Sequence, residues 1–317
     1  MNDPIVYSLD PAEIECSGPW LLHDSTPVAN IVPSFAKRGQ LVPVLLVKDG
    51  EKTLLVAGRA RVAAARELGR KVTGIYIDAP DDISRAVAHL EENSSRTADE
   101  CVKSNTFRFF AERMEKADMA KTLGALFGIS PNSREMTFRL DWLDLEPVFD
   151  TLLAAGNIPL PAVAVLGRMS AGDRAAVLPF FEKIGWSRSN AVNFLTWLYE
   201  TARREGQTVS GLIESSGLAP ATEGESPKDA VSRLCRAARM LRYPHLVELE
   251  CAHAKLVSEI CAGTRWKVEP SGIFETGEVV MQTRFKSREM MRKAVADLET
   301  IEKFAGWEDI FDLGRDK

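Results

Sequence analysis

An arginine-rich segment follows a short apolar run at residues 54–69, which read LLVAGRARVAAARELG. The run 54–56 predicts a strand, Gly58 a turn, and the alanine- and arginine-rich residues after it a helix. A helix N-terminus presents unpaired N–H groups and a partial positive charge, and Arg59 and Arg61 add two cations beside it. This combination suits an anion such as a phosphate. The stretch alone favours a simpler interpretation, a surface helix with two solvated arginines.

The other residue types that commonly do chemistry form no recognisable site. None of the five cysteines stands in a CxxC pair, and the four histidines have no ligand spacing with them. This pattern argues against a metal centre or a disulfide framework. The chain has no Walker P-loop, so an ordinary ATPase site is not expected. No Ser/His/Asp or Cys/His set can be proposed, and no catalytic residue is predicted.

The composition is that of an ordinary soluble protein with room for two or three domains. The chain has 317 residues, 45% of them hydrophobic and 27% charged, and a net charge of −5. The acidic balance argues against strong sequence-independent binding of nucleic acid by the whole chain, but it leaves room for a local basic surface. The sequence has no apolar run of bilayer length and no signal-peptide pattern, so we expect a cytoplasmic protein without a membrane partner.

Residues 1–97 alternate strand-like and helix-like runs, which predicts an α+β domain with a small mixed sheet. The expected strands lie at 5–9, 41–47, 53–57 and 72–77, and the expected helices at 28–37, 59–68 and 82–92. The second and third of these strands form a hairpin across the turn at 48–51.

Residues 98–214 show helical periodicity without a convincing strand, so an all-α domain is expected next. Residues 119–127 read as a helix that ends at Gly128. Ser130 and Pro131 supply an N-cap and a first-turn proline for the following helix. Two helices joined at a glycine predict a helix-turn-helix, although helical hairpins occur in any bundle. Further helices are expected at 147–155, 161–167, 171–184 and 187–205.

A linker is expected at 215–227, where Ser, Gly, Pro and Glu predominate. Beyond it, residues 228–317 are predicted to form a helical segment interrupted near Pro244, then a hairpin, then a last helix capped by Ser287. A hairpin and one helix bury little surface. This C-terminal unit is therefore expected to pair with a copy of itself or to dock on the rest of the chain.

Three stretches in order resemble the ParB family of chromosome and plasmid partition proteins. Residues 58–65, GRARVAAA, resemble the family's Gly-Glu-Arg-Arg-x-Arg-Ala-Ala box, and residues 92–96, ENSSR, resemble its Glu-Asn-x-x-Arg box. Upstream, residues 38–44, RGQLVPV, look like its Gly-x-x-Gln-Pro strand entry. The resemblance covers about residues 4–200, and the terminal hairpin and helix at 264–303 also resemble the dimerisation domain of some members.

The resemblance implies a homodimeric, DNA-binding protein of plasmid or chromosome partition, associated with the nucleoid or a plasmid, with a ParA-like ATPase as a further partner. It also implies that the N-terminal domain holds CTP with Mg²⁺ and closes as a clamp on DNA, with at most slow CTP hydrolysis. Arginines offset phosphate charge, while Glu92 and Asn93 are oxygen ligands suited to Mg²⁺. The implied nucleotide-binding residues are Gly58, Arg59, Arg61, Ala64, Glu92, Asn93 and Arg96.

The arginine box departs from the family pattern at several positions. Arg59 stands in place of its glutamate, Ala60 and Ala63 in place of two arginines, and Val42 where the upstream glutamine is expected. Two lost charge-assisted hydrogen bonds would cost on the order of a few kcal/mol of binding. Two hypotheses therefore stay open: a CTP-gated clamp, and a ParB-fold adaptor or transcriptional regulator that has lost nucleotide control.

The candidate DNA contacts lie around the second helix of the predicted helix-turn-helix: Asn132, Ser133, Arg134, Thr137 and Arg139. Arginine can read guanine, asparagine can read adenine, and Ser or Thr can hold phosphate. A polar face of an ordinary bundle helix is the alternative. Arg134 stands where the family usually buries an aliphatic residue. Either the helix is rotated, so that Met136 and Phe138 are its buried contacts, or Arg134 lies at a margin and faces DNA.

An enzyme is the third class considered, because the family's N-terminal domain is related to sulfiredoxin and to some nucleases. Sulfiredoxin's phosphate turn needs a reactive cysteine beside its glycines, and residues 56–59 contain none. The chain is therefore expected to be at most a slow CTPase and otherwise a non-enzymatic DNA-binding protein.

Overall fold

The computed structural model describes residues 5–23, 29, 31–94, 99–270, 272, 274 and 277–313. Contacts between residues divide the chain into two units, Met1–Leu195 and Thr196–Lys317. Within the described ranges, none of the helices combines the length and the hydropathy that crossing a bilayer requires.

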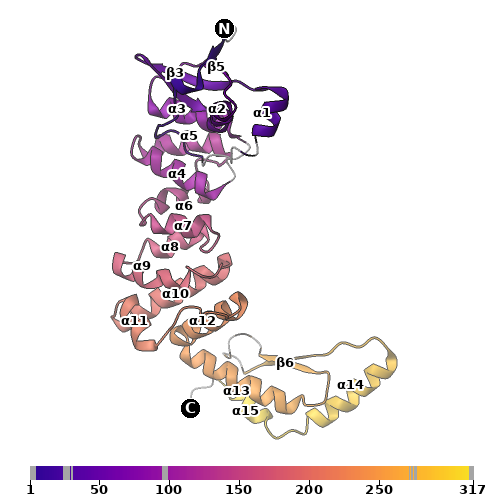
Figure 1. Cartoon of the computed structure of the whole chain (residues 1–317). Coiled ribbons are helices and arrows are strands. Elements are labelled where there is room, and N and C mark those ends of the chain that lie inside the picture. Colours follow the sequence, from indigo (N-terminus) through magenta and orange to yellow (C-terminus); the bar gives the residue numbers. More distant parts are fainter. Residues whose placement is uncertain are drawn as a thin grey trace. The chain divides into compact units, whose positions relative to one another are not determined.

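The small mixed sheet predicted from the sequence begins the first unit and has five strands, one more than expected (Figure 1). Its strands run in the order β1-β5-β3-β4-β2, with β3 and β4 paired as an antiparallel hairpin and β3 parallel to β5. The strands are β1 (Val6–Leu9), β2 (Ile14–Glu15), β3 (Val44–Asp49), β4 (Lys52–Ala57) and β5 (Val72–Tyr76). The two-residue β2 was not predicted, because a strand of that length has no periodicity to detect.

Helices cover both faces of the sheet. Along β4, Leu55 packs in a cluster with Val62 of α2, whereas Val56 packs with Leu90 of α3. Alternate residues of a strand point to opposite faces, so a strand buried on both faces reads as a continuous apolar run. The helices of this part are α1 (Val32–Arg38), α2 (Arg59–Glu67) and α3 (Asp82–Glu92), preceded by the short 3₁₀ helix Pro11–Glu13.

The rest of the first unit is helical. Its elements are α4 (Glu100–Ala111), α5 (Lys116–Phe127), α6 (Arg134–Trp142), α7 (Val148–Ala154), the 3₁₀ helix Leu160–Ala162, α8 (Val163–Leu166), α9 (Ala171–Val177), the 3₁₀ helix Leu178–Phe180, and α10 (Arg188–Glu205), which crosses into the second unit. The single helix expected at 171–184 is shorter, because Pro179 lacks the N–H that an α-helix needs and a 3₁₀ turn replaces it.

The predicted N-cap of α6 is wrong. The cap is Ser133, whose hydroxyl accepts a hydrogen bond from the N–H of Met136. Ser130 and Pro131 belong instead to a turn, in which the N–H of Ser133 donates to the carbonyl of Ser130 at 3.0 Å. The other predicted boundary is confirmed: α5 ends at Gly128, which has a left-handed φ of 67°.

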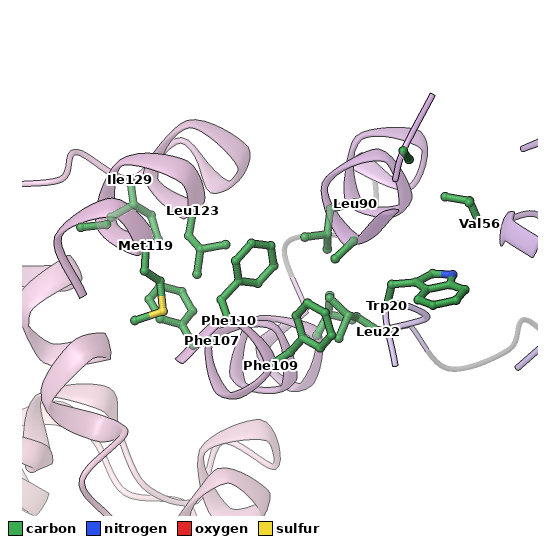
Figure 2. Close-up of a cluster of buried hydrophobic side chains, with 14 of the residues drawn as sticks. Trp20, Leu22, Val56, Leu90, Phe107, Phe109, Phe110, Met119, Leu123 and Ile129 are labelled. Carbon is green, nitrogen blue, oxygen red and sulfur yellow. The ribbon is translucent and has the colours of Figure 1, made fainter. Parts of the chain in front are cut away.

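One hydrophobic core joins the sheet to the first helices of the all-α part, across the change of fold class expected at 97/98. Phe107, Phe109 and Phe110 of α4 pack with Leu90 of α3 and with the indole of Trp20 in one cluster. Figure 2 shows the three phenylalanines between α3 on one side and α5, with Met119 and Leu123, on the other. The sheet and the helices up to α6 are therefore packed as a single body.

The second unit contains helices and one β-hairpin. After α10 come α11 (Val209–Ser216), α12 (Pro227–Arg242), α13 (Pro244–Ile260), β6 (Lys267–Pro270), β7 (Val279–Gln282), α14 (Arg288–Ile301) and α15 (Trp307–Phe311). The break at Pro244, the hairpin and the Ser287 cap match the expectation. α15 was not predicted. The hairpin and α14 pack on the end of α13 and on α15 around Ile260, Ile301 and Ile310.

The stretch expected to be a linker, 215–227, holds an ordered turn. Its first two residues end α11, and Ala221 is buried. Arg233 of α12 donates to both carboxylate oxygens of Glu225, at 2.9 and 3.0 Å, and to the carbonyl of Ala219 at 3.1 Å. The polar composition predicts a linker, but several of these polar groups are bonded to the helix that follows.

Candidate functional site

The turn before α2 requires a glycine. Gly58 is the N-terminal flanking residue of α2 and has φ +105°. A Cβ at this position would lie 2.7 Å from Cγ1 of Val44. The turn thus brings the end of β4 close to β3 and directs the first turn of α2 toward the loop that leads into β3.

Arg61 joins the two sequence boxes in space. Its guanidinium donates to Glu92 Oε1 at 2.8 Å, so a residue of α2 meets the last residue of α3. It also donates to the carbonyls of Pro43 at 2.6 Å and Val42 at 3.1 Å. The Arg61 side chain is 21% exposed and that of Glu92 is 29% exposed, so this ion pair is only partly screened by water.

A groove of about 350 Å³ opens beside this ion pair. It lies between α1 and the loop 39–43, and its lining residues are Ile31, Ser34, Phe35, Gly39, Gln40, Leu41, Val42, Arg61 and Glu92. The Gln40 amide holds the loop in place by bonding both backbone groups of Thr73, at 2.6 and 2.8 Å. Gln40 was not predicted as a site residue, although it lies within residues 38–44, which resemble the family's strand entry.

Among the described residues, the others predicted for the nucleotide do not line the groove. Arg59 is absent from its lining, and its charge acts instead on Cys16. Burial raises the pKa of the Cys16 thiol, and the positive charges of Arg66 and Arg59 partly oppose that rise. Ala64 is fully buried in the core under α2. Arg96 lies outside the described residues.

Glu92 and Asn93 were predicted to hold Mg²⁺. Asn93 is the C-cap of α3, and its side-chain amide donates to the carbonyl of His89 at 2.8 Å. Within the ranges that the structure describes, no group of three or more His, Cys, Asp and Glu side chains could hold a metal ion. Mg²⁺ in nucleotide sites is usually held by one or two carboxylates together with substrate phosphates. One carboxylate and one amide oxygen donor fit that smaller requirement.

The candidate DNA surface lies at the start of α6. Asn132, Arg134 and Thr137 are exposed, and Ser133 is half-buried because its hydroxyl caps the helix. Met136 and Phe138 are buried beneath them. α5 and α6 are joined by a close turn: a Cβ on Gly124 of α5 would lie 2.6 Å from the carbonyl oxygen of Ile129.

The structure has features of both arrangements considered for Arg134, while contact of Arg134 with DNA stays a prediction. Met136 is fully buried and Phe138 is 9% exposed, so these residues anchor the helix. Arg134 lies at the margin of that contact, with its guanidinium carbon 5.1 Å from the centre of the Phe138 ring. Arg134 is exposed.

Arg139 lies apart from the other four candidates. Its side chain is 5% exposed and bridges two carboxylates, Glu100 of α4 and Glu135 of α6, with closest distances of 3.0 Å. Its guanidinium also lies 5.8 Å from the ring of Phe107. In this structure Arg139 belongs to the packing between α4 and α6 and does not face solvent.

Two crystal structures of the C-terminally truncated chromosome-partitioning protein ParB from Caulobacter crescentus are similar to this chain. The structure complexed with CTP-gamma-S is 15% identical, over 54% of this chain and 96% of that one, with a TM-score of 0.26. The structure complexed to the centromeric parS site is 13% identical, over 66% of this chain and 99% of that one, with a TM-score of 0.36. TM-scores this low do not establish a shared fold or function. No protein-family model matches the sequence, and a search of curated proteins finds no match.

Proposed function

We propose that this chain is a ParB-like DNA-binding protein of plasmid or chromosome partition, or a related regulator, whose groove beside α2 binds CTP with Mg²⁺. The contact between Arg61 and Glu92 carries the nucleotide part of the proposal, because two motifs 31 residues apart meet at 2.8 Å. The exposed start of α6 carries the DNA part. A ParA-like ATPase is the further partner that partition requires.

The groove has the groups that a nucleoside triphosphate needs. Arg61 supplies a cation at the N-terminal end of α2, where helix N–H groups also favour phosphate. Glu92 and Asn93 supply the oxygen donors for Mg²⁺. Glu92 is paired with Arg61 in this structure. When a triphosphate binds, this pair would separate: Arg61 would bind the phosphate and Glu92 the metal.

Three features favour a second candidate, an ungated adaptor or regulator. Ala60 and Ala63 cannot contact phosphate charge, and Arg59 does not line the groove. The guanidinium of Arg61 already bonds Glu92 and two carbonyls. In this candidate, the ion pair joins α2 to α3 permanently and replaces the nucleotide.

Calorimetric titration of the whole chain with CTP and Mg²⁺ separates the two candidates. The gated protein binds CTP with saturation, and Glu92→Gln weakens binding in Mg²⁺ more than in EDTA. Arg59→Gln is the control, because Arg59 lies outside the groove lining. If no heat of binding is measured at millimolar CTP, the gated clamp is wrong and the ungated adaptor or regulator remains.

DNA binding is tested by pulldown of the protein with bound genomic DNA and sequencing. A discrete, repeated site is expected, and Arg134→Gln should weaken binding to it by about tenfold or more, as the loss of one base or phosphate contact does. Arg113→Gln is the control, because Arg113 stacks on Phe109 at the far end of α4. A genome-wide absence of enrichment would sink the DNA proposal.

Self-association is proposed through the terminal hairpin and α14. Val280, Met291 and Val295 are large apolar side chains that are each about half exposed, at 51%, 49% and 53%. A second copy would cover them. Val295→Lys should convert a dimer to a monomer in sedimentation velocity, whereas Met240→Lys, at a comparably exposed position on α12, should not. A wild-type chain that sediments as a monomer at micromolar concentration would refute the dimer.

A further inference from the structure

Arg139 is the only described arginine that is both nearly buried and bonded to two carboxylates from different helices of the α4–α6 region. Nη1 and Nη2 donate to the two oxygens of Glu100, at 3.1 and 3.0 Å, and Nε and Nη2 donate to Glu135 Oε1 at 3.1 and 3.0 Å. Two parallel N–H···O bonds to one carboxylate fix direction as well as distance.

The pKa of Glu100 agrees with a strong contact. Burial raises this pKa, but the hydrogen bonds and charge of Arg139, with a smaller contribution from Lys103, outweigh the burial and bring it below its ordinary value. Glu100 is therefore ionised at neutral pH and keeps its bond to Arg139. Since Glu100 stands in the first turn of α4 and Arg139 in the last turn of α6, the bridge joins opposite ends of two neighbouring helices.

A second arginine contacts the chain just beyond the same end of α6. Arg108 of α4 donates to the carbonyls of Leu143 and Leu145, at 2.7 and 2.9 Å, which are acceptors just beyond the end of α6. The same guanidinium is paired with Asp150 of α7, and Asp150 also accepts from the indole of Trp142. α6 is thus fixed against α4 at two separate points.

We propose that Arg139 is a positioning residue for DNA recognition, which sets the pose of α6 through Glu100 and Glu135 without touching DNA itself. The inference rests on the proposed function, in that it takes the exposed start of α6 as the surface that contacts DNA. A rotation or shift of α6 about its axis moves Asn132, Arg134 and Thr137 together. Specific contacts to bases are lost by such a movement, whereas the count of phosphate contacts changes little.

A direct contact and a positioning role predict opposite results for Glu100. If Arg139 contacted DNA directly, Glu100 would compete with DNA for its guanidinium. Glu100→Gln would then leave the affinity for DNA unchanged or raise it. If Arg139 acts through Glu100, the substitution Glu100→Gln weakens specific binding in the same way as Arg139→Gln does. The double variant Arg139→Gln/Glu100→Gln should then lose little more than either single variant, because both remove one bridge.

The experiment uses the full chain and the DNA sequence that the wild-type chain selects from a random duplex pool. Fluorescence anisotropy gives affinity for that sequence and for a scrambled duplex over a series of salt concentrations. We expect Arg139→Gln and Glu100→Gln each to reduce specific affinity on the order of tenfold, with scrambled-duplex affinity and the salt slope unchanged. Arg113→Gln, the arginine control, should leave the affinity for both duplexes and the salt slope unchanged. Amide exchange should show faster exchange in α6 for the two bridge variants alone.

A salt slope that falls by about one in Arg139→Gln means a direct phosphate contact and overturns the inference. Wild-type affinity in Glu100→Gln also overturns it. Should Arg139→Gln fail to fold, Glu100→Gln decides alone, because Glu100 is one-third exposed and its neutral amide keeps the shape of the side chain. If the wild-type chain selects no DNA sequence, the proposed function is wrong. This result needs no variant, so it is distinguishable from a failure of the positioning role alone.

Discussion

Gly58 holds a backbone conformation that other residues adopt only with strain. Its φ is +105°, and an added Cβ would lie 2.7 Å from Cγ1 of Val44. We predict that Gly58→Ala lowers the free energy of unfolding by about 2 kcal/mol or more, because backbone strain and a clash add. Urea denaturation followed by circular dichroism measures this change.

Gly69→Ala is the matched control for that substitution. Gly69 also has a positive φ, of 60°, but a Cβ there would meet no atom within 4 Å. Only the backbone term remains, on the order of 1 kcal/mol. Equal costs for the two variants would contradict the role of the close approach to Val44.

The Arg61 and Glu92 pair shows how far sequence reasoning reaches at a site. The resemblance of their two motifs to the ParB family implied that these residues share a site, and they meet. Arg59, Ala64 and Arg61 stand within six positions of each other on the same helix, yet their surroundings differ: the charge of Arg59 acts on Cys16, Ala64 is buried in the core, and Arg61 lines the groove. A motif lists residues along the chain, whereas the direction of each side chain depends on how α2 packs on the sheet.

Glu225 gives a pH dependence that can be measured. Hydrogen bonds from Arg233, then from the N–H of Thr222, lower its pKa from 4.5 to about 2. The folded-state pKa lies below the unfolded value, so the stabilisation is complete above pH 4.5 and is lost as the pH falls toward 2.

We therefore predict that Glu225→Gln removes part of the acid dependence of stability between pH 4.5 and 2 while the fold is retained. Thermal unfolding across this pH range measures it. Glu223→Gln, at an exposed neighbouring position, should leave the acid dependence as in the wild-type chain. A variant whose melting temperature follows the wild-type pH profile throughout would show that Arg233 does not hold this turn.

The N-terminus of α6 gives a prediction at the scale of the element. The Ser133 hydroxyl caps the helix, whereas Ser130 contributes only its backbone carbonyl to the preceding turn. Ser133→Ala should cost about 1 kcal/mol of unfolding free energy, and Ser130→Ala should be close to neutral. Guanidinium denaturation of both variants measures the difference. A larger effect of Ser130→Ala would restore the cap predicted from the sequence.

Most elements could be predicted because their signals are local. α3 matches its expected bounds. An aspartate cap marks its start, and the apolar residues at helical spacing continue to its last turn. The cap of α6 could not be chosen in the same way, because Ser130 and Ser133 both precede a helical stretch. The packing of Met136 against α5 selects the later start. β2 exists only through its pairing with β4, and no local signal marks it.

At the scale of the molecule, the sequence predicts a change of fold class near residue 98 but not the core that crosses it. The phenylalanines of α4 resemble an ordinary apolar helix face in the sequence. Their packing against Trp20 and Leu90 depends on the placement of α3 and is not visible from periodicity. The ordered turn at 215–227 was missed for a similar reason: the hydrogen bonds that hold it come from Arg233, which lies outside the stretch.

The shared core predicts that the sheet and the helices up to α6 unfold together. Phe110 is fully buried between α3 and α5, so Phe110→Ala should lower the free energy of unfolding by about 3–5 kcal/mol. Because one cluster contains residues from both parts, amides of β4 and of α5 should lose protection to the same extent in native-state hydrogen exchange. Val148→Ala, at a half-exposed position of the same unit, is the control. It should change the opening free energies of β4 and of α5 by less than about 1 kcal/mol each. If Phe110→Ala increased exchange in α5 but left β4 protected, the boundary near residue 98 would separate two independently folding domains, and the common core would not couple them.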